Sequence, residues 1–362
     1  CQFIGYARLL IRTDISSKQQ SMDMNLRTYL CMLYNAYAIN AVLGNCPGKC
    51  LCESSNKVQC QDETITEIPR IFDDLSNLES LSLKDNQIEH LPSNLFSSLE
   101  NLVTLYLSRN NLVRLPEGIF LHVTRLQKLS LFQNRLENLG TSVFGPLLLT
   151  ELWLYSNNLT RLEDGIFRNL TKLQLLILSR NSICSVSAGA FAGLSDLREV
   201  SLHTNRLVSL EEGTFAHLNN LVNISLRHNQ IQSLPRGIFH NLPRLRCIVL
   251  SQNPWRCDHD IIPFRNWLQA HWSKVPNLTS VVCQTPLNLS RINIAKLTDK
   301  DLGRYKRFLS RAMTLIAVTL ISTSVISITF LCCLFRRSLD RKYCLSNFSR
   351  DSLTSANVQA PQ

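Results

Sequence analysis

The 362-residue sequence predicts an α/β solenoid, a horseshoe of short stacked repeats with a parallel sheet on its concave face. Two periodicities predict this fold class. An asparagine closes the frame L-x-x-L-x-L-x-x-N at positions 86, 110, 134, 157, 181, 205, 229 and 253. A phenylalanine recurs in step with it at positions 72, 96, 120, 144, 167, 191, 215 and 239. A chain that was merely rich in leucine would not hold two residue types to a step of 24 that becomes 23 only once.

This frame is that of a leucine-rich repeat, and it predicts the structural role of each position in the repeat. One such repeat cannot bury its own apolar face, so neighbouring repeats lay short strands side by side and their leucines form one core. We expect the phenylalanines to form a spine on the convex side and the asparagine amides to satisfy buried backbone groups. The one-residue deletion lies between Phe144 and Asn157, in the convex connection GPLLLT, where a deletion costs least.

Two segments precede the first cysteine cluster. Residues 1–23 show no coherent pattern and stay unassigned. Residues 24–44 begin with a short basic stretch, continue with a mostly apolar run and offer small residues for cleavage at Ala36-Tyr37-Ala38. That order of features predicts a signal peptide, which would direct the following repeats into the secretory pathway.

Cysteines flank the repeat array (62–254) on both sides and predict disulfide-bonded caps at 45–61 and 255–300. The first cap holds Cys46, Cys50, Cys52 and Cys60, and the second holds Cys257 and Cys283. Without such caps the end repeats would expose their leucine-lined faces. A structural zinc site is the alternative for the first group, but N-glycosylation sequons and an apolar membrane segment elsewhere favour an oxidising compartment and therefore disulfides.

Two further cysteines lie inside the array. Cys184 and Cys247 stand more than two repeats apart, and at about 4.8 Å per strand this exceeds the reach of a disulfide between them. We therefore expect both to be buried free thiols.

An uncharged segment predicts a transmembrane helix. After a juxtamembrane stretch at 301–311, residues 312–335 carry no charge and are followed by Arg336 and Arg337. A helix of these 24 residues would be about 36 Å long, enough to cross a bilayer core of about 30 Å. Residues 336–362 would then be a cytoplasmic tail, too short to fold into an enzymatic or signalling domain.

Sequons place the repeats outside the cell, because five of them precede the predicted helix, at Asn158, Asn169, Asn223, Asn277 and Asn288. Lysine and arginine are similarly frequent on both sides of the helix, so charge alone does not orient it. We expect a type I single-pass glycoprotein of the plasma membrane. Much of the net charge of +11 lies near the helix without a nucleic-acid-binding motif, so nucleic acid is not expected as a partner.

The concave face is the expected binding surface, because side chains alternate along a strand and those between the core leucines point outward. In the N-terminal half this rule gathers Tyr106, Phe132, Trp153, Tyr155 and Ile177 on neighbouring strands. Exposed aromatic side chains grouped in this way favour a protein partner. The alternative is a set of surface rings tucked against each other, with no role in binding.

No metal, cofactor or catalytic site is expected. The C-terminal half of the concave face carries His203 and His228, but two histidines without a third ligand do not make a metal site. A glycan at Asn223 would shield part of this half. A nucleophile, a base and an orienting acid cannot be assembled, and a Gly-rich phosphate loop does not appear, so we expect a non-enzymatic protein.

The segments VFGPLLLTELWLYSNNL and NPWRCDHDIIPFRNWL carry a resemblance that runs from about Cys46 to Cys283. They resemble the extracellular leucine-rich-repeat glycoproteins of the leucine-rich repeat-containing protein 15 and platelet glycoprotein V family. The resemblance implies three disulfides, Cys46–Cys52, Cys50–Cys60 and Cys257–Cys283. It also implies a cell-surface receptor in cell adhesion that binds extracellular matrix proteins such as collagen, fibronectin and laminin.

A second function class stays open beside adhesion. The same scaffold would suit an innate-immune pattern-recognition or accessory receptor without a signalling domain of its own. In either case the signal would pass through an associated protein, such as a lateral co-receptor in the membrane.

Overall fold

The computed structural model describes residues 50–61, 64–66 and 75–302. They fall into two compact units, one of 50–256 with 261–296 and a smaller one of 257–260 with 297–302. Within the described residues, no helix is both long and apolar enough to cross a membrane. The predicted signal peptide at 24–44, the predicted transmembrane helix at 312–335 and Cys46 lie outside the described residues.

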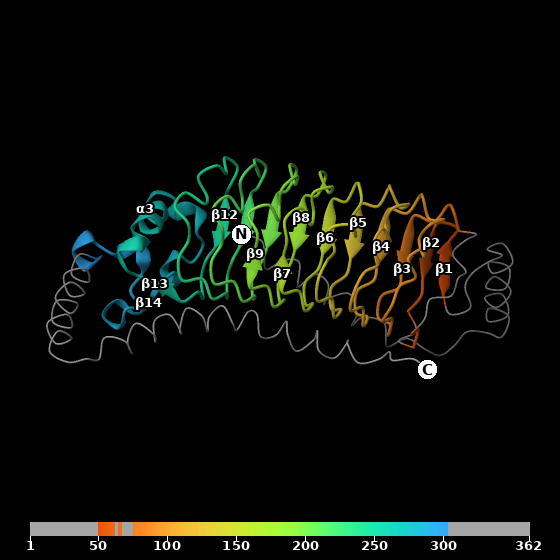
Figure 1. Cartoon of the computed structure of the whole chain (residues 1–362), viewed down its shortest axis with the longest axis horizontal. Coiled ribbons are helices and arrows are strands. Elements are labelled where there is room, and N and C mark those ends of the chain that lie inside the picture. The colour runs from red at the N-terminus through yellow and green to blue at the C-terminus, as the bar shows by residue number, and fades with distance from the viewer. Residues whose placement is uncertain (1–49, 62–63, 67–74, 303–362) are drawn as a thin grey trace, which may run out of the picture. The chain divides into compact units, whose positions relative to one another are not determined.

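The larger unit is a solenoid built on one ten-stranded sheet (Figure 1). Its strands follow the order β1 (Leu51–Ser54), β2 (Lys57–Gln59), β3 (Ser80–Ser82), β4 (Thr104–Tyr106), β5 (Lys128–Ser130), β6 (Glu151–Trp153), β8 (Leu175–Ile177), β10 (Glu199–Ser201), β11 (Asn223–Ser225) and β12 (Cys247–Val249). All pairs are parallel except the first, in which β1 runs antiparallel to β2 and covers the end of the sheet. The predicted parallel-sheet solenoid is confirmed.

In each main-sheet strand from β2 to β12 the central residue is buried in the core, and the flanking residues belong to the other face of the sheet, where Ser82, Ser130, Ser201, Ser225 and Cys247 are also buried. Leu81, Leu105, Leu129, Leu152 and Leu176 are fully buried at the central position. The deletion between β5 and β6 leaves the register intact, since Lys128 still pairs with Glu151 and Leu129 with Leu152. The connection at 145–150 absorbs the missing residue, as expected for a surface segment.

The opposite side of the solenoid is made of turns stacked on the phenylalanine spine. Rings of neighbouring repeats lie 6.0 to 6.2 Å apart between centroids, from Phe96 to Phe167 and again from Phe191 to Phe239. Two short strands, β7 (Arg161–Leu162) and β9 (Ser185–Val186), also pair away from the main sheet. Phe72 lies outside the described residues. The helical part of the predicted α/β class is absent from the described repeats, because turns around one phenylalanine already fill this side.

The asparagine ladder forms hydrogen bonds to the backbone of its own repeat and of the preceding repeat. Asn134 Nδ2 donates to the carbonyls of Leu107 (2.9 Å) and Leu131 (3.0 Å), and Asn134 Oδ1 accepts from Leu112 N (3.1 Å). The residue before each ladder asparagine has a left-handed backbone, with φ between 52° and 59° at positions 85, 109, 133, 156, 180, 204, 228 and 252. This reversal turns the asparagine side chain inward.

The C-terminal cap closes the other end of the core. It contains the paired strands β13 (Trp255–Arg256) and β14 (Cys283–Thr285), helix α3 (Ile262–Ala270), and the 3-10 helices η1 (His259–Ile261), η2 (Trp272–Lys274), η3 (Leu278–Ser280), η4 (Leu287–Leu289) and η5 (Ile294–Lys296). Rings of α3 reach the core, with Phe264 4.8 Å from Trp255 and Trp267 4.9 Å from Phe239 between centroids. In the smaller unit, Thr298 and Asp301 hydrogen-bond each other's backbone and side-chain groups.

Candidate functional site

The predicted binding residues lie on the face of the sheet that points away from the core, which we call the open sheet face. They occupy two rows that run across neighbouring strands. The first row is Tyr106, Ser130, Trp153 and Ile177, in direct register on β4, β5, β6 and β8. The second row holds Phe132 and Tyr155, two residues beyond the ends of β5 and β6. We call Tyr106, Phe132, Trp153, Tyr155 and Ile177 the aromatic patch; all five are half-buried.

Two rings of the aromatic patch stack on each other. The centroids of Phe132 and Tyr155 lie 4.5 Å apart, with 9° between the ring planes. The Arg109 guanidinium carbon lies 6.0 Å from the centroid of the Phe132 ring, within cation–π range. Phe132 and Tyr155 thus contact each other while part of each ring stays exposed, and the role of the patch in binding stays a prediction. Rings held this way lose little conformational freedom when a partner binds.

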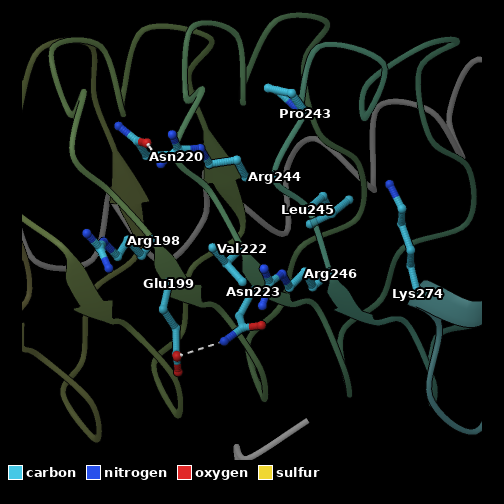
Figure 2. A pocket seen from close by; sticks show the side chains of 10 residues that line it. All are labelled: Arg198, Glu199, Asn220, Val222, Asn223, Pro243, Arg244, Leu245, Arg246 and Lys274. Carbon is cyan, nitrogen blue, oxygen red and sulfur yellow. Dashed lines mark hydrogen bonds between the residues drawn. The ribbon is translucent and has the colours of Figure 1, made fainter.

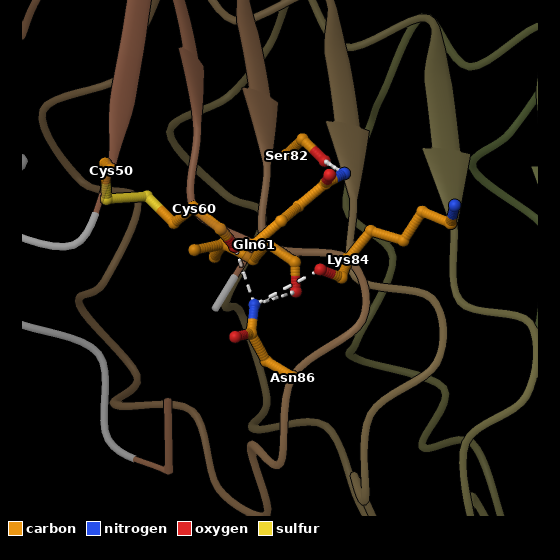
Figure 3. The surroundings of a disulfide bond; sticks show 7 residues. Cys50, Cys60, Gln61, Ser82, Lys84 and Asn86 are labelled. Carbon is orange, nitrogen blue, oxygen red and sulfur yellow. Dashed lines mark hydrogen bonds between the residues drawn. A yellow bond between two sulfur atoms is a disulfide. The ribbon is translucent and has the colours of Figure 1, made fainter. Parts of the chain in front are cut away.

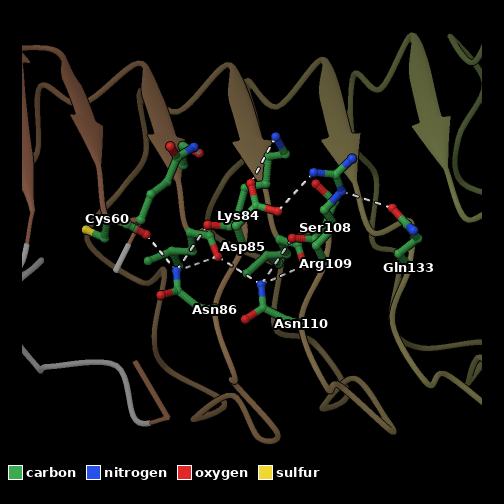
Figure 4. A network of polar contacts seen from close by, with 12 residues as sticks. Cys60, Lys84, Asp85, Asn86, Ser108, Arg109, Asn110 and Gln133 are labelled. Atoms are coloured by element: carbon green, nitrogen blue, oxygen red, sulfur yellow. Dashed lines mark hydrogen bonds and ion pairs between the residues drawn. The ribbon is translucent and has the colours of Figure 1, made fainter. Parts of the chain in front are cut away.

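Arg109 is held in place by polar neighbours on both sides (Figure 4). One guanidinium nitrogen lies 3.2 Å from Asp85 Oδ1, and Arg109 Nε donates to Gln133 Oε1 at 3.0 Å. Asp85 also pairs with Lys84 at 3.0 Å. Asp85, Arg109 and Gln133 all occupy the left-handed position before a ladder asparagine, so their side chains form a polar row beside the aromatic patch. The direction of the Arg109 side chain does not follow from alternation along a strand, because alternation does not extend to this backbone reversal.

At the Tyr155 hydroxyl, the effect of burial on the pKa outweighs that of the nearby positive charges. Burial raises the pKa of Tyr155 above its usual range, and the positive charges of Arg109 and Arg180 oppose this shift without cancelling it. A neutral phenol both donates and accepts a hydrogen bond. The edge of the patch is therefore suited to a partner that presents backbone amides or carbonyls.

Small side chains lie between the rings. Ser130 stands between Tyr106 and Trp153 in the first row, and Ser108 lies one repeat before Phe132 in the second. Both serines are 0 to 1 % exposed, and within the described part of the chain their hydroxyls have no hydrogen-bond partner. These two positions of the rows therefore add no exposed polar group to the patch.

The C-terminal half of the open sheet face has a different character. Burial and the charges of Arg180, Arg227 and His228 lower the pKa of His203 to about 4, so this ring is neutral at physiological pH. Burial raises the pKa of Glu199, although a hydrogen bond of 3.2 Å from Asn223 opposes that shift. Among the residues that the structure describes, no group of three potential metal ligands is found.

The cap cysteines that the structure describes are all disulfide-bonded. Cys50 bonds to Cys60, one of the pairs that the resemblance implies (Figure 3). Cys52, Cys257 and Cys283 are bonded too, and their pairing stays a prediction.

The expectation of free thiols inside the array is wrong. Cys184 and Cys247 are each disulfide-bonded, and Cys184 is half-buried rather than buried. The separation between the two excluded a bond joining them to each other. It did not exclude a bond from either one to a cysteine elsewhere in the chain.

The five sequons differ in exposure. Asn158, Asn169, Asn277 and Asn288 are exposed, whereas Asn223 is half-buried on the open sheet face. Asn169 donates to the Phe144 carbonyl at 3.3 Å. Glycosylation of all five stays a prediction.

The family model of the leucine rich repeat matches this chain at residues 65–112, 76–136, 100–156, 147–207 and 195–254, which together cover more than half of it. The chain belongs to the leucine-rich repeat family. Human leucine-rich repeat-containing protein 15 is 49% identical over 37 residues, which are 10% of this chain and 6% of that protein. This match therefore covers only a small part of that relative's length.

Two solved structures of leucine-rich repeat proteins are similar to the chain. Human 5T4, also called Wnt-activated inhibitory factor 1 and trophoblast glycoprotein, aligns with a TM-score of 0.59 and 28% identity. That alignment covers 71% of this chain and 98% of the 5T4 chain. TLR13, solved as a complex with the RNA ssRNA13, aligns with a TM-score of 0.51 and 29% identity over 58% of this chain and 35% of its own. Such family membership indicates a ligand-binding protein built around a repeat surface.

Proposed function

We propose that this leucine-rich repeat protein is a type I single-pass receptor of the plasma membrane that binds an extracellular protein through the aromatic patch. Extracellular matrix proteins such as collagen, fibronectin and laminin are the proposed ligands. The stacked Phe132–Tyr155 pair, with Arg109 beside it, is the observation that carries the proposal. Aromatic and arginine side chains dominate the binding energy of protein interfaces, and rigid rings lose little entropy on binding.

The remaining parts of the chain support an extracellular placement of this surface. Disulfide bonds at the described cap cysteines are typical of an oxidising compartment. The sequons and the uncharged segment at 312–335 are consistent with the same orientation. The chain is similar to human 5T4, which is named trophoblast glycoprotein, and this similarity supports a glycosylated protein.

Replacing Trp153 and Tyr155 by alanine tests the patch. The full chain is displayed on cultured cells, and capture of labelled collagen, fibronectin and laminin is measured by flow cytometry. We expect the double variant to bind the captured ligand at least 30-fold more weakly, because an interface hot spot contributes about 2 kcal/mol or more. An antibody to an epitope tag reports the surface level of each variant.

The matched control replaces Leu121 and Leu148 by alanine, since these apolar side chains are 56% and 50% exposed and lie away from the sheet. Tyr155→Phe keeps the ring stack and should retain most of the binding. Equal capture by the Trp153/Tyr155 variant and the unchanged chain, at equal surface level, would move the site away from the patch.

The second candidate function is an innate-immune pattern-recognition or accessory receptor. The similarity to TLR13, whose structure was solved with single-stranded RNA, favours keeping it. The same displayed chain is exposed to single-stranded RNA and bacterial cell-wall products. Binding of these products without binding of any matrix protein would reverse the order of the two candidates.

A further inference from the structure

A groove lies beside the last three strands of the main sheet (Figure 2). It has a volume of about 820 Å³ and is lined by residues that precede or begin β10 and β11, by residues that precede β12, and by Lys274 of η2 in the C-terminal cap. A second hollow of about 450 Å³ shares Val222, Asn223, Arg246 and Lys274 with it. Both hollows are therefore lined by residues of the repeats and of the C-terminal cap.

The lining is strongly cationic. It contains Arg198, Arg244, Arg246 and Lys274, against a single carboxylate, Glu199. The three arginines are exposed, and Arg244 donates a hydrogen bond of 2.6 Å to Asn220 Oδ1. In the part of the chain that the structure describes, none of these four cations forms an ion pair. Four cations beside a single carboxylate favour an anionic ligand.

The spacing of the charges indicates an extended ligand rather than a single small anion. Arg198 directly precedes β10 and Arg246 directly precedes β12. Val222 directly precedes β11, the strand between those two. Two steps across a sheet are about 10 Å, which is comparable to the length of a disaccharide unit. Sulfate and carboxylate groups that recur along a polysaccharide would therefore meet successive cations.

The groove lacks the feature that single-stranded nucleic acids use. Bases bind by stacking on aromatic side chains, and the ten residues that line the groove include no aromatic ring. Arginine forms paired hydrogen bonds with planar or tetrahedral oxyanions, so three exposed arginines suit sulfate groups well.

We propose that this groove binds a sulfated glycosaminoglycan chain, with Arg198, Arg246 and Lys274 as its main contacts. The proposal rests on the proposed function only in requiring that the repeats are extracellular. Asn223 lines the groove and belongs to a sequon, so a glycan on Asn223 would occupy part of the same space. Loss of that sequon is therefore expected to strengthen binding.

The test compares charge-neutralised variants of the purified full chain on immobilised heparin and in solution with heparan sulfate. The triple variant Arg198→Gln, Arg246→Gln, Lys274→Gln should bind about tenfold more weakly or worse, because each exposed ion pair contributes a factor of roughly two to five. The matched control, Arg114→Gln, Arg135→Gln, Arg206→Gln, removes three exposed charges outside the groove and should leave binding nearly unchanged. Ser225→Ala removes the sequon while keeping Asn223, and it should bind more tightly than the unchanged chain.

Three results would overturn the proposal. Equal weakening of both triple variants would show a net-charge effect rather than a site. Failure of both the unchanged chain and Ser225→Ala to bind heparin would exclude a glycosaminoglycan site. Preference for single-stranded RNA of equal charge would assign the groove to another ligand. Trp153→Ala with Tyr155→Ala should keep heparin binding, so a failure of this proposal and a failure of the aromatic patch are distinguishable.

Discussion

The amide of Asn134 shows why one residue type recurs at this place in every repeat. Its nitrogen donates to two backbone carbonyls and its oxygen accepts from a backbone amide, and these bonds connect two neighbouring repeats. An amide of this length places a donor and an acceptor within reach of both repeats at once. An unpaired buried carbonyl or amide would cost about 1–3 kcal/mol, so the position tolerates little variation.

His203 predicts a pH dependence of stability. Its pKa is about 4 in the folded chain against 6.5 for an unperturbed histidine. Below pH 6.5 the unfolded chain gains a proton that the folded chain does not take up, so the unfolding free energy falls from pH 6.5 toward pH 4 and then levels off. Because the ring is partly exposed, solvent screening reduces the expected loss to roughly 1–2 kcal/mol.

Denaturant unfolding of the unchanged chain and of His203→Gln between pH 7 and pH 4 measures this effect. The variant lacks the titrating ring, so its stability should fall less steeply over that range. His217→Gln, which changes an exposed histidine outside the open sheet face, should follow the unchanged chain. Parallel curves for all three proteins would mean that His203 is not a source of the acid sensitivity.

At the level of elements, the turns opposite the sheet depend on close backbone approach as much as on the phenylalanine spine. Gly193 has φ +89°, and a Cβ there would lie 2.4 Å from the Arg168 carbonyl oxygen of the preceding repeat. Gly213 has nearly the same φ, +88°, but a Cβ there would meet nothing within 4 Å. An alanine at Gly213 would therefore cause backbone strain alone, whereas an alanine at Gly193 would add steric overlap with the preceding repeat.

We expect Gly193→Ala to lower the unfolding free energy by about 3 kcal/mol or more, and Gly213→Ala by about 1 kcal/mol. Both variants place a side chain in a left-handed conformation, but only the first pushes two repeats apart. Thermal or denaturant unfolding of the pair measures the difference. Equal losses in the two variants would mean that the contact with Arg168 relaxes at little cost.

At the scale of the whole repeat unit, each repeat contacts only its neighbours, so the ends depend on their caps. The Cys50–Cys60 disulfide holds β1 against the first strands, and Cys60 N also donates to the Ser82 carbonyl at 2.7 Å. Replacing Cys50 and Cys60 by serine should lower the unfolding free energy by about 3 kcal/mol. Hydrogen exchange should increase most in β2 and β3 and progressively less toward β8.

Hydrogen exchange followed by mass spectrometry distinguishes local fraying from global loss. The gradient along the strands is the expected outcome for a stack with nearest-neighbour coupling. Uniform loss of protection from β2 to β12 would instead show that the array unfolds as one cooperative unit.

The aromatic patch shows how much of a site follows from sequence alone. Alternation along β4, β5, β6 and β8 was enough to place Tyr106, Trp153 and Ile177 in one row, because strand geometry repeats at every step. It did not predict the stack of Phe132 on Tyr155, which depends on side-chain rotamers. Nor did it predict Arg109, whose direction is set by a left-handed backbone.

The sequence by itself determined the solenoid, because a 24-residue period repeats one environment and so tells which residues face the core. Leu129, Phe144 and Asn134 had their positions assigned in this way, and the structure agrees. Only the tertiary structure decided which residues from different repeats and from the cap line one surface, as Arg198 and Lys274 do along the groove. Such combinations depend on where the cap packs against the repeats and on side-chain rotamers. The 24-residue period specifies neither of them.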